Sequence, residues 1–440
     1  MNWIPQIAFI LVLGTALAIF IYHVRLLRRT ILLGREAPLP GTSAQRWRQM
    51  LEIAILQGRM KDRPAASIAH WVIYVGFLVI NIEVVEILLD GLLGTHRILA
   101  PYIGILYNIM TTGVEIFLGL VFVAAVIFLW RRNILKLPRF HTAEMRGWPP
   151  LDANIILWTE IALVVALFFM NASDQVLQQR RVEPYIQAGT FPLSQWAVPL
   201  LSGLSDDALI LIERFSWWAH IIGILAFLNY IPFSKHLHIF LSFPNTYYAP
   251  ITPPAQQDSL PQVTSVVRET LGLPVSGQGD GTEAPSVLGA KDVTELTWKN
   301  LLDAYTCTEC GRCTSVCPAH ITGKKLSPRK IMMDTRDRLE EIKRTIHQKG
   351  KWEPDGKSLL GDYITPEELW ACTTCGACVR ACPVLINPVS IIQQLRQYLV
   401  MEASQAPETI NVLFVNMENN GSPWALPSEK RLQWMENIIT

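Results

Sequence analysis

Five long apolar stretches dominate the first half of the chain. They cover residues 4–24, 67–89, 102–130, 151–170 and 208–231, and the first of them holds no charged residue. A helix needs roughly 20 apolar residues to cross the hydrocarbon layer of a bilayer. The pattern therefore predicts five membrane-spanning helices packed as a bundle.

The first apolar stretch has an alternative interpretation as a cleavable signal peptide, because "ALA" at residues 16–18 resembles a cleavage site. However, no basic segment precedes it, and the apolar residues continue past that site. Arg25, Arg28 and Arg29 then follow, as they do after a stop-transfer helix. We therefore expect this stretch to remain as the first span.

Basic residues between the spans predict the orientation, because connections rich in Lys and Arg stay in the cytoplasm. The second connection holds only Arg97, and the fourth, residues 171–207, balances basic against acidic residues. The first and third connections are strongly basic, through Arg25, Arg28, Arg29, Arg35, Arg46, Arg48, Arg59, Lys61 and Arg63 in one and Arg131, Arg132, Lys136, Arg139 and Arg146 in the other. We expect a multi-pass protein of the prokaryotic inner membrane, with its N-terminus outside and its C-terminal part in the cytoplasm.

The polar second half begins with a segment, residues 251–294, that is rich in Pro, Gly, Gln and Ser. Its "PVSGQGDGTEAPS" is typical of a flexible linker. Residues 295–400 predict a soluble helical domain, and residues 401–440 form a C-terminal extension whose sequence gives no clear signal. The predicted fold class is all-α, with a membrane domain over residues 1–250.

Helix start signals recur in residues 295–400. Ser327 precedes Pro328, as an N-cap precedes a proline in the first turn. Thr365 and Glu368 have the spacing of a capping box. Asn387 is likewise followed by a proline. No sustained alternation of apolar and polar residues predicts a strand here.

The amino-acid composition further restricts the possible classes of function. The net charge is +1, so the chain has no basic excess that would suggest nucleic acid as a partner. All eight cysteines lie in two short runs, "CTECGRCTSVCPA" and "CTTCGACVRACPV". A secreted disulfide framework spreads its cysteines through a small chain. These cysteines instead have the pattern of metal ligands kept as thiolates in a reducing compartment.

Both runs follow C-x2-C-x2-C-x3-C-P, which is the spacing of bacterial ferredoxins with two [4Fe–4S] clusters. In such proteins the fourth cysteine of each run binds the other cluster. The predicted ligands are Cys307, Cys310, Cys313 and Cys382 for one cluster, and Cys372, Cys375, Cys378 and Cys317 for the other. Zinc is the alternative, but zinc sites usually combine two pairs of ligands rather than four cysteines in a run.

Histidines near the spans are candidate axial ligands for haem b. His70 lies near the cytoplasmic start of the second span. His220 and His238 are eighteen residues apart, which in a continuous helix would place both on one face. We expect His70 and His238 to bind one haem. A second haem at His220 is left open, with His96 as the nearest second ligand and His236 undecided.

Four carboxylates, Glu83, Glu86, Glu115 and Glu160, fall within the predicted spans. Intramembrane carboxylates often mark proton or quinone sites, although pairing inside the bundle is equally compatible with the sequence. The sequence does not rank one of them above the others.

Together these residues carry a family resemblance. The five spans with "IPFSKHLHIFLSFPN" after them resemble the cytochrome b (gamma) subunit of respiratory nitrate reductase and the related membrane subunits of heterodisulfide reductases and sulfite-reduction complexes. The two cysteine runs and "LSPRKIM" are similar to the dicluster domain of heterodisulfide-reductase-type proteins. The fused arrangement resembles membrane Fe–S oxidoreductases that pass electrons from electron-transfer flavoprotein to menaquinone.

Two departures from those families limit what the resemblance implies. Ile80 stands where nitrate reductase gamma subunits carry a second histidine, which weakens the prediction of an outer haem. The chain also has no adjacent Cys-Cys pair, so we do not expect heterodisulfide chemistry in it. The resemblance instead implies a partner for substrate chemistry, either a Cys-Cys-motif Fe–S subunit or an electron-transfer flavoprotein.

The sequence thus predicts an oxidoreductase subunit that passes electrons between a cytoplasmic donor and the quinone pool, through two [4Fe–4S] clusters and haem b. No catalytic side chain is predicted. The alternative is a non-catalytic membrane anchor or redox-sensing subunit of a heterodisulfide-reductase-like complex. A stand-alone dehydrogenase or disulfide reductase is disfavoured, because the chain lacks both a flavin fingerprint and a Cys-Cys module.

Overall fold

The computed structural model describes residues 3–37, 39, 41–253, 256, 261–274 and 288–435. Within these residues the secondary structure is helical and no strand is formed, which confirms the predicted all-α class. Two isolated backbone bridges, Arg35 with Thr297 and Leu360 with Ile364, are the only extended pairings in this part of the chain.

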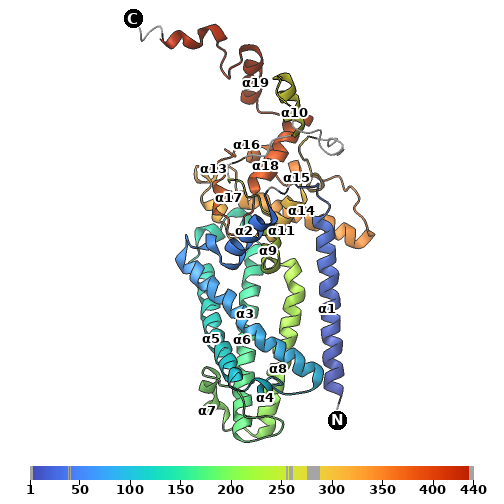
Figure 1. The fold of residues 1–440 in the computed structure, drawn as a ribbon, viewed down its shortest axis with the longest axis vertical. Helices are drawn as coiled ribbons and strands as arrows, with labels where there is room; N and C mark the ends of the chain where they lie inside the picture. The colour runs from blue at the N-terminus through green and yellow to red at the C-terminus, as the bar shows by residue number, and fades with distance from the viewer. Residues whose placement is uncertain are drawn as a thin grey trace.

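Five helices are long and apolar enough to cross a membrane, as the hydrophobic pattern predicted. They are α1 (Ile4–Ile31), α3 (Pro64–Leu93), α5 (Ile105–Asn133), α6 (Trp148–Gln179) and α8 (Asp206–Tyr230). α3, α5, α6 and α8 pack into a bundle, and α1 runs beside α3 and α8 at its edge (Figure 1). Only 11% of the apolar window of α1 is buried inside the protein, so most of its surface faces outward.

Two spans differ from the predicted bounds for identifiable reasons. α6 continues to Gln179 rather than ending near residue 170, because Asn171 and Asp174 find buried polar partners. α5 starts at Ile105 because Gly104 adopts a φ of 52°, which ends the short helix α4 (Ala100–Ile103) before it. Glycine takes this left-handed region without steric cost.

Short helices fill the connections of the membrane part. They are α2 (Ser43–Met50), η1 (Leu51–Ile55), η2 (Gly58–Met60), η3 (Pro138–Phe140), η4 (Ala143–Met145), η5 (Ser194–Ala197), α7 (Val198–Leu201), η6 (Ile231–Phe233), η7 (Lys235–Leu237) and α9 (His238–Tyr247). A helix α10 (Pro261–Thr270) lies within the segment predicted as a linker. Residues 275–287, which include most of the Gly-rich part of that linker, are outside the described residues.

The cysteine-containing domain consists of short helices around one longer helix. They are η8 (Val293–Glu295), α11 (Trp298–Thr306), α12 (Arg312–Ser315), α13 (Pro318–Ile321), α14 (Pro328–Lys349), α15 (Leu359–Asp362), α16 (Pro366–Trp370), α17 (Ala377–Ala381), α18 (Pro388–Gln397) and η9 (Tyr398–Glu402). The three predicted caps are confirmed. Ser327 caps α14, Thr365 and Glu368 form the capping box of α16, and Asn387 caps α18.

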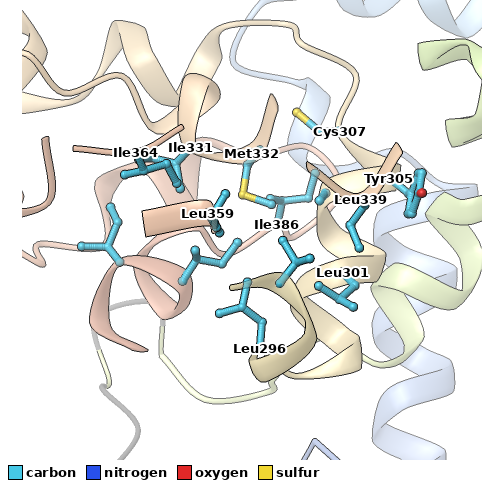
Figure 2. Packing of buried hydrophobic residues seen from close by; sticks show 14 of the residues in the cluster. Leu296, Leu301, Tyr305, Cys307, Ile331, Met332, Leu339, Leu359, Ile364 and Ile386 are labelled. Atoms are coloured by element: carbon cyan, nitrogen blue, oxygen red, sulfur yellow. The ribbon is translucent and has the colours of Figure 1, made fainter. Parts of the chain in front are cut away.

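An apolar core holds these helices together. Leu301 of α11, Leu339 of α14 and Ile386 next to α18 are buried in one cluster, and Cys307 lies at its edge beside Met332 (Figure 2). The loops that carry the cysteines are therefore anchored by helices whose inner faces are fully buried. Burial of this kind contributes roughly 1.5–3 kcal/mol per large aliphatic side chain.

The cysteine-containing domain sits directly on one end of the bundle, and α4 and α7 lie at the opposite end (Figure 1). α1 is tied to this domain in three places. The backbone of Arg35 exchanges hydrogen bonds with Leu296 O and Trp298 N, and the Arg29 side chain donates to Gly350 O at 2.6 Å. Tyr22 Oη and His347 Nδ1 are 2.5 Å apart. Beyond η9, α19 (Glu408–Asn420) and η10 (Ser428–Leu432) extend away from the rest of the molecule.

Candidate iron–sulfur site and the membrane histidines

The two cysteine runs fold into loops of matching backbone shape. Gly311 and Gly376 both occupy the left-handed region, with φ of 71° and 72°. Two residues earlier in each run, Glu309 and Thr374 share a φ of 54°. A short helix follows each glycine, α12 in one case and α17 in the other. The repeat seen in the sequence is therefore a structural repeat.

Two neighbouring cavities gather the eight cysteines, and each takes members from both runs. The first is lined by Cys307, Cys310, Cys313 and Cys382, and the second by Cys317, Cys372, Cys375 and Cys378. Cys378 also reaches the wall of the first cavity. The fourth cysteine of each run thus lies with the first three of the other, as the spacing predicts.

The chemistry of this donor set suits iron–sulfur clusters. Burial raises the pKa of the Cys307 thiol to about 11 and that of Cys378 to about 12, so a thiolate at either position needs a cation to stabilise it. A bound metal deprotonates its thiol ligands outright. Backbone amides also point at sulfur: Thr374 N donates to Cys372 Sγ, and Ile386 N to Cys382 Sγ, both at 3.3 Å.

The cysteines line two cavities rather than converging on the position of a single ion. Among the described residues, no three His, Cys, Asp or Glu side chains are placed to hold a single metal ion. A four-iron cluster instead needs sulfur ligands spread around a larger group. The two cavities, each lined by cysteines of both runs, fit the predicted clusters.

The first cysteine loop is bound to the membrane part by a buried ion pair. Glu309, between Cys307 and Cys310, accepts hydrogen bonds from Lys235 of η7 and from Arg336 of α14. Burial alone would raise the pKa of Glu309, but Arg336 and Lys235 outweigh it and hold that pKa below its usual value. The carboxylate is therefore ionised and joins the two parts of the molecule.

Two arginines reinforce this contact between the domain and the bundle. Arg312 donates to Arg59 O in the first connection at 3.1 Å. Arg329, which is fully buried, donates to Arg139 O at 2.6 Å and to Glu144 at 2.8 Å in the third connection. Both basic connections therefore lie at the end of the bundle that carries the cysteine-containing domain.

His70 and His238, the predicted pair of haem ligands, lie close together at this same end. Their ring centroids are 6.3 Å apart. His70 Nδ1 donates to Gln57 Oε1 at 3.2 Å, and His238 Nδ1 donates to Lys235 O at 3.0 Å. With Nδ1 fixed in this way, each Nε2 is left as the nitrogen able to bind a metal.

The expectation that His220 and His238 share a helix face is wrong, because the helix is not continuous between them. α8 ends at Tyr230, the turns η6 and η7 follow, and His238 is the first residue of α9. Pro232 and the extended backbone of Ser234 interrupt the helical register. His236, which the sequence left undecided, lies near His238, with ring centroids 5.7 Å apart.

His220 occupies a separate position in the middle of α8. Its Nδ1 donates to Leu163 O of α6 at 2.9 Å, and its Nε2 is buried without a hydrogen-bond partner. This orphaned nitrogen is compatible with a metal ligand. His96, the suggested second ligand, instead lies 3.3 Å from Asp174.

At the opposite end of the bundle, Arg97 is the centre of a buried polar network. Its guanidinium donates to Asp174 Oδ2 at 2.5 Å, to Asn171 Oδ1 at 2.9 Å and to Tyr107 Oη at 3.0 Å. Of the carboxylates considered from the sequence, Glu86 accepts from Tyr107 Oη and Leu99 N, and Glu115 accepts from Asn171 and the 193–194 backbone. Glu86 and Glu115 are thus fixed by hydrogen bonds within the bundle.

Glu83 is different from its neighbours. It is only 2% exposed, and neither carboxylate oxygen has a hydrogen bond; Arg97 Nη1 is 3.7 Å away and already engaged. Glu160, in the middle of α6, is half-buried. The structure therefore separates Glu83 from the paired carboxylates of the network, which the sequence did not do.

Sequence reasoning missed Glu309, Arg312 and Lys235 as contact residues. A signal was present in the repeat itself, since the first run carries Glu309 and Arg312 where the second has Thr374 and Ala377. These charged side chains of the first run contact the membrane part, whereas the second run contacts it through backbone carbonyls, such as Val379 O with Arg59.

Comparison with known proteins agrees with this description. The 4Fe-4S dicluster domain family matches residues 306–386, which include all eight cysteines. The chain is 26% identical, over 97% of its length and 60% of the relative, to the probable iron-sulfur-binding oxidoreductase FadF of Bacillus subtilis. It is also 26% identical, over 89% of its length and 54% of the relative, to EtfAB:quinone oxidoreductase of Syntrophomonas wolfei.

A third relative matches a shorter part of the chain. It is one component of the ferredoxin/F(420)H(2)-dependent CoB-CoM heterodisulfide reductase of Methanosarcina acetivorans, 33% identical over 27% of this chain and 60% of that protein. The chain spans about half to three fifths of the length of its two long relatives. No solved structure matches it.

Fold and site together define a membrane protein with a 4Fe-4S dicluster domain at one end of a five-helix bundle. The relatives confirm the resemblance found in the sequence. That resemblance is to membrane Fe–S oxidoreductases in which a cytochrome b-like helix bundle is fused to a heterodisulfide-reductase-type dicluster domain.

Proposed function

We propose that the chain is an electron-transfer subunit of the membrane, which passes electrons from a cytoplasmic donor to a quinone. The observation that carries the proposal is the docking of the first cysteine loop on the bundle through Glu309 and Lys235. The carbonyl of the same Lys235 accepts a hydrogen bond from His238. A continuous polar bridge therefore joins the iron–sulfur domain to the membrane histidines.

The proposed cluster ligands follow the two cavities. Cys307, Cys310, Cys313 and Cys382 bind the cluster nearer the membrane, and Cys317, Cys372, Cys375 and Cys378 bind the outer one. When bound, each cluster supplies a one-electron carrier. The chain's own residues position these carriers and shield them from water, since seven of the eight cysteines are buried or half-buried on well-packed loops while Cys375 alone among them is exposed.

For haem b, the donor geometry supports His70 and His238 as ligands. Haem b would be held by two imidazoles at once, so the two rings must lie near each other. The ring centroids of His70 and His238 are 6.3 Å apart. Gln57 and the Lys235 carbonyl orient the two rings through Nδ1. His220, with its unpartnered Nε2, is the proposed ligand of a second haem for which the described residues show no partner histidine.

Orientation and partners belong to the same proposal. Both strongly basic connections contact the iron–sulfur domain, and basic connections stay in the cytoplasm. We therefore place that domain in the cytoplasm and the N-terminus outside. The long relatives are named as an iron-sulfur-binding oxidoreductase and an EtfAB:quinone oxidoreductase, which supports electron-transfer flavoprotein as donor and a quinone as acceptor. Menaquinone is the quinone that the family resemblance implies.

An optical and EPR redox titration of the purified chain tests the function. We expect signals from two [4Fe–4S] clusters and a low-spin haem with two histidine ligands, all reducible by a menaquinol analogue. A preparation with full iron and sulfide but without haem, or with haem that quinol does not reduce, would contradict the proposed route.

A further inference from the structure

A cavity of ≈190 Å³ opens where α3, α5 and α6 reach the end of the bundle that carries the iron–sulfur domain. Its lining includes the apolar side chains of Phe128, Ile156 and Leu157. It also includes three arginines, Arg131, Arg132 and Arg139. A cavity lined by both apolar and cationic side chains suits an amphipathic anion.

The arginines present unused hydrogen-bond donors. Arg132 Nε, Arg139 Nε and Arg139 Nη1 are buried and have no acceptor in the structure. The two guanidinium groups also lie close to one ring, 4.9 Å and 4.8 Å from the centroid of Phe140. Two like charges and three unsatisfied buried donors in one place are unfavourable unless an anion joins them.

No carboxylate among the described residues pairs directly with these arginines, although Glu309 and Asp152 attract Arg132 from farther away. In the part of the chain that the structure describes, none of the three arginines forms an ion pair. The carboxylates in this region are already occupied. Asp152 accepts from Tyr230 and Ser234, Glu144 accepts from Arg329, and Glu309 accepts from Lys235.

The position of the cavity indicates where the anion comes from. The cavity lies at the last turn of α5 and the first turns of α6, where Trp130 and Trp148 are exposed. Tryptophans mark the interface of a bilayer, the level at which lipid phosphates lie. Basic pockets between helices at this level bind acidic headgroups.

We infer that Arg132 and Arg139 bind an oxyanion carried by an apolar molecule, namely the phosphate of an anionic phospholipid. A tetrapyrrole bound at His70 would present the same chemistry through its carboxylates, because Ala66 in the cavity wall lies one helical turn before His70. Binding of a lipid phosphate at these arginines requires neither the clusters nor electron transfer. Its test is therefore separate from the test of the proposed function.

The lipid arm of the test uses the full chain in phosphatidylcholine vesicles that contain spin-labelled phosphatidylglycerol. Immobilised label reports the bound lipid. We expect Arg139→Gln and Arg132→Gln to weaken its binding at least about tenfold, the loss typical of a charge-assisted hydrogen bond. Arg139→Lys should restore part of it. Arg146→Gln, an exposed arginine of the same connection, should bind like the unaltered chain.

The second arm measures the haem midpoint potential of the same variants. If Arg139→Gln binds the lipid normally but lowers the haem potential, and Arg146→Gln leaves that potential unchanged, the site binds the tetrapyrrole carboxylates rather than a lipid phosphate. If neither lipid binding nor potential changes in Arg132→Gln and Arg139→Gln, the oxyanion site is refuted. Iron–sulfur absorbance and a single gel-filtration peak verify folding, and the Arg→Lys variants replace any Gln variant that does not fold.

Discussion

Each cysteine run contributes three sulfur atoms to one cavity and the fourth to the other, which leads to a prediction at the scale of single residues. Cys382→Ser should remove the same cluster as Cys307→Ser, and Cys317→Ser the same cluster as Cys372→Ser. Each variant should lose about half of the iron and one of two EPR signals, because a [4Fe–4S] cluster needs four ligands.

Iron analysis and EPR of the reduced protein show which cluster each variant has lost. If ligation stayed within each run, Cys382→Ser would instead share its spectrum with Cys372→Ser. That result would rule out the crossed ligand sets.

Neutralising two buried carboxylates near Arg97 should affect the stability of the protein differently. Asp174→Asn removes the closest partner of a buried guanidinium, and breaking a buried ion pair of this kind costs about 3–5 kcal/mol. Glu83→Gln removes a carboxylate that accepts no hydrogen bond, so stability should stay the same or rise slightly. Thermal unfolding of both variants in one detergent compares them, and equal destabilisation would contradict this view of the network.

At the scale of elements, the break between α8 and α9 separates His220 from His238. His70→Ala and His238→Ala should each abolish the same low-spin haem spectrum, whereas His220→Ala should retain it. His141→Ala serves as a control, since His141 is exposed in the third connection. Loss of that spectrum in His220→Ala, with His238→Ala unaffected, would reverse the assignment.

Gly311 is the point where the first cysteine loop and the third connection come closest. A Cβ there would lie 2.6 Å from Arg329 Nη1 and 3.2 Å from Arg139 O. Gly311→Ala should therefore break the hydrogen bond from Arg329 to Arg139 O, in addition to a cost of about 1–2 kcal/mol for the left-handed backbone.

Gly323 separates these two effects. Its φ is +80°, but a Cβ there would meet nothing within 4 Å, so Gly323→Ala has only the backbone cost. Hydrogen–deuterium exchange over residues 138–145 should increase in Gly311→Ala and stay unchanged in Gly323→Ala. The same exchange in both variants would mean that Arg329 does not fix this connection.

At the scale of the whole molecule, Glu309 joins the iron–sulfur domain to the bundle. Glu309→Gln removes a negative charge beside the first cluster, so that cluster should become easier to reduce. One unit charge at about 10 Å and an effective dielectric of 20 corresponds to about 1–2 kcal/mol, or several tens of millivolts for one electron. Potentiometric EPR measures the shift.

Thr374→Val is the matched control, because Thr374 occupies the equivalent position in the second run with the same φ. Only the Glu309 variant should also slow reduction of the membrane haem. Equal shifts of both clusters in Glu309→Gln would show that the carboxylate acts on overall stability rather than on the first cluster.

The sequence predicts those structural features that neighbouring residues determine, and it misses those that depend on residues far apart in the chain. The presence of five spans and the caps of α14, α16 and α18 depend on neighbouring residues, and both were confirmed. The end of α6 and the network around Arg97 depend on partners in other parts of the chain, such as Asp174, which is 77 residues from Arg97, and periodicity does not reveal them. The helix between His220 and His238 was misjudged because Pro232 stops α8, although a proline there was visible in the sequence.

The attachment of α1 to the iron–sulfur domain has a consequence for how the protein is made. Arg35 pairs with the backbone at Thr297, which is translated 262 residues later. At about 5–20 residues per second, that delay is roughly 13–52 s. During this interval α1 can pack only against α3 and then α8, so its attachment to the iron–sulfur domain forms after all five spans have been translated.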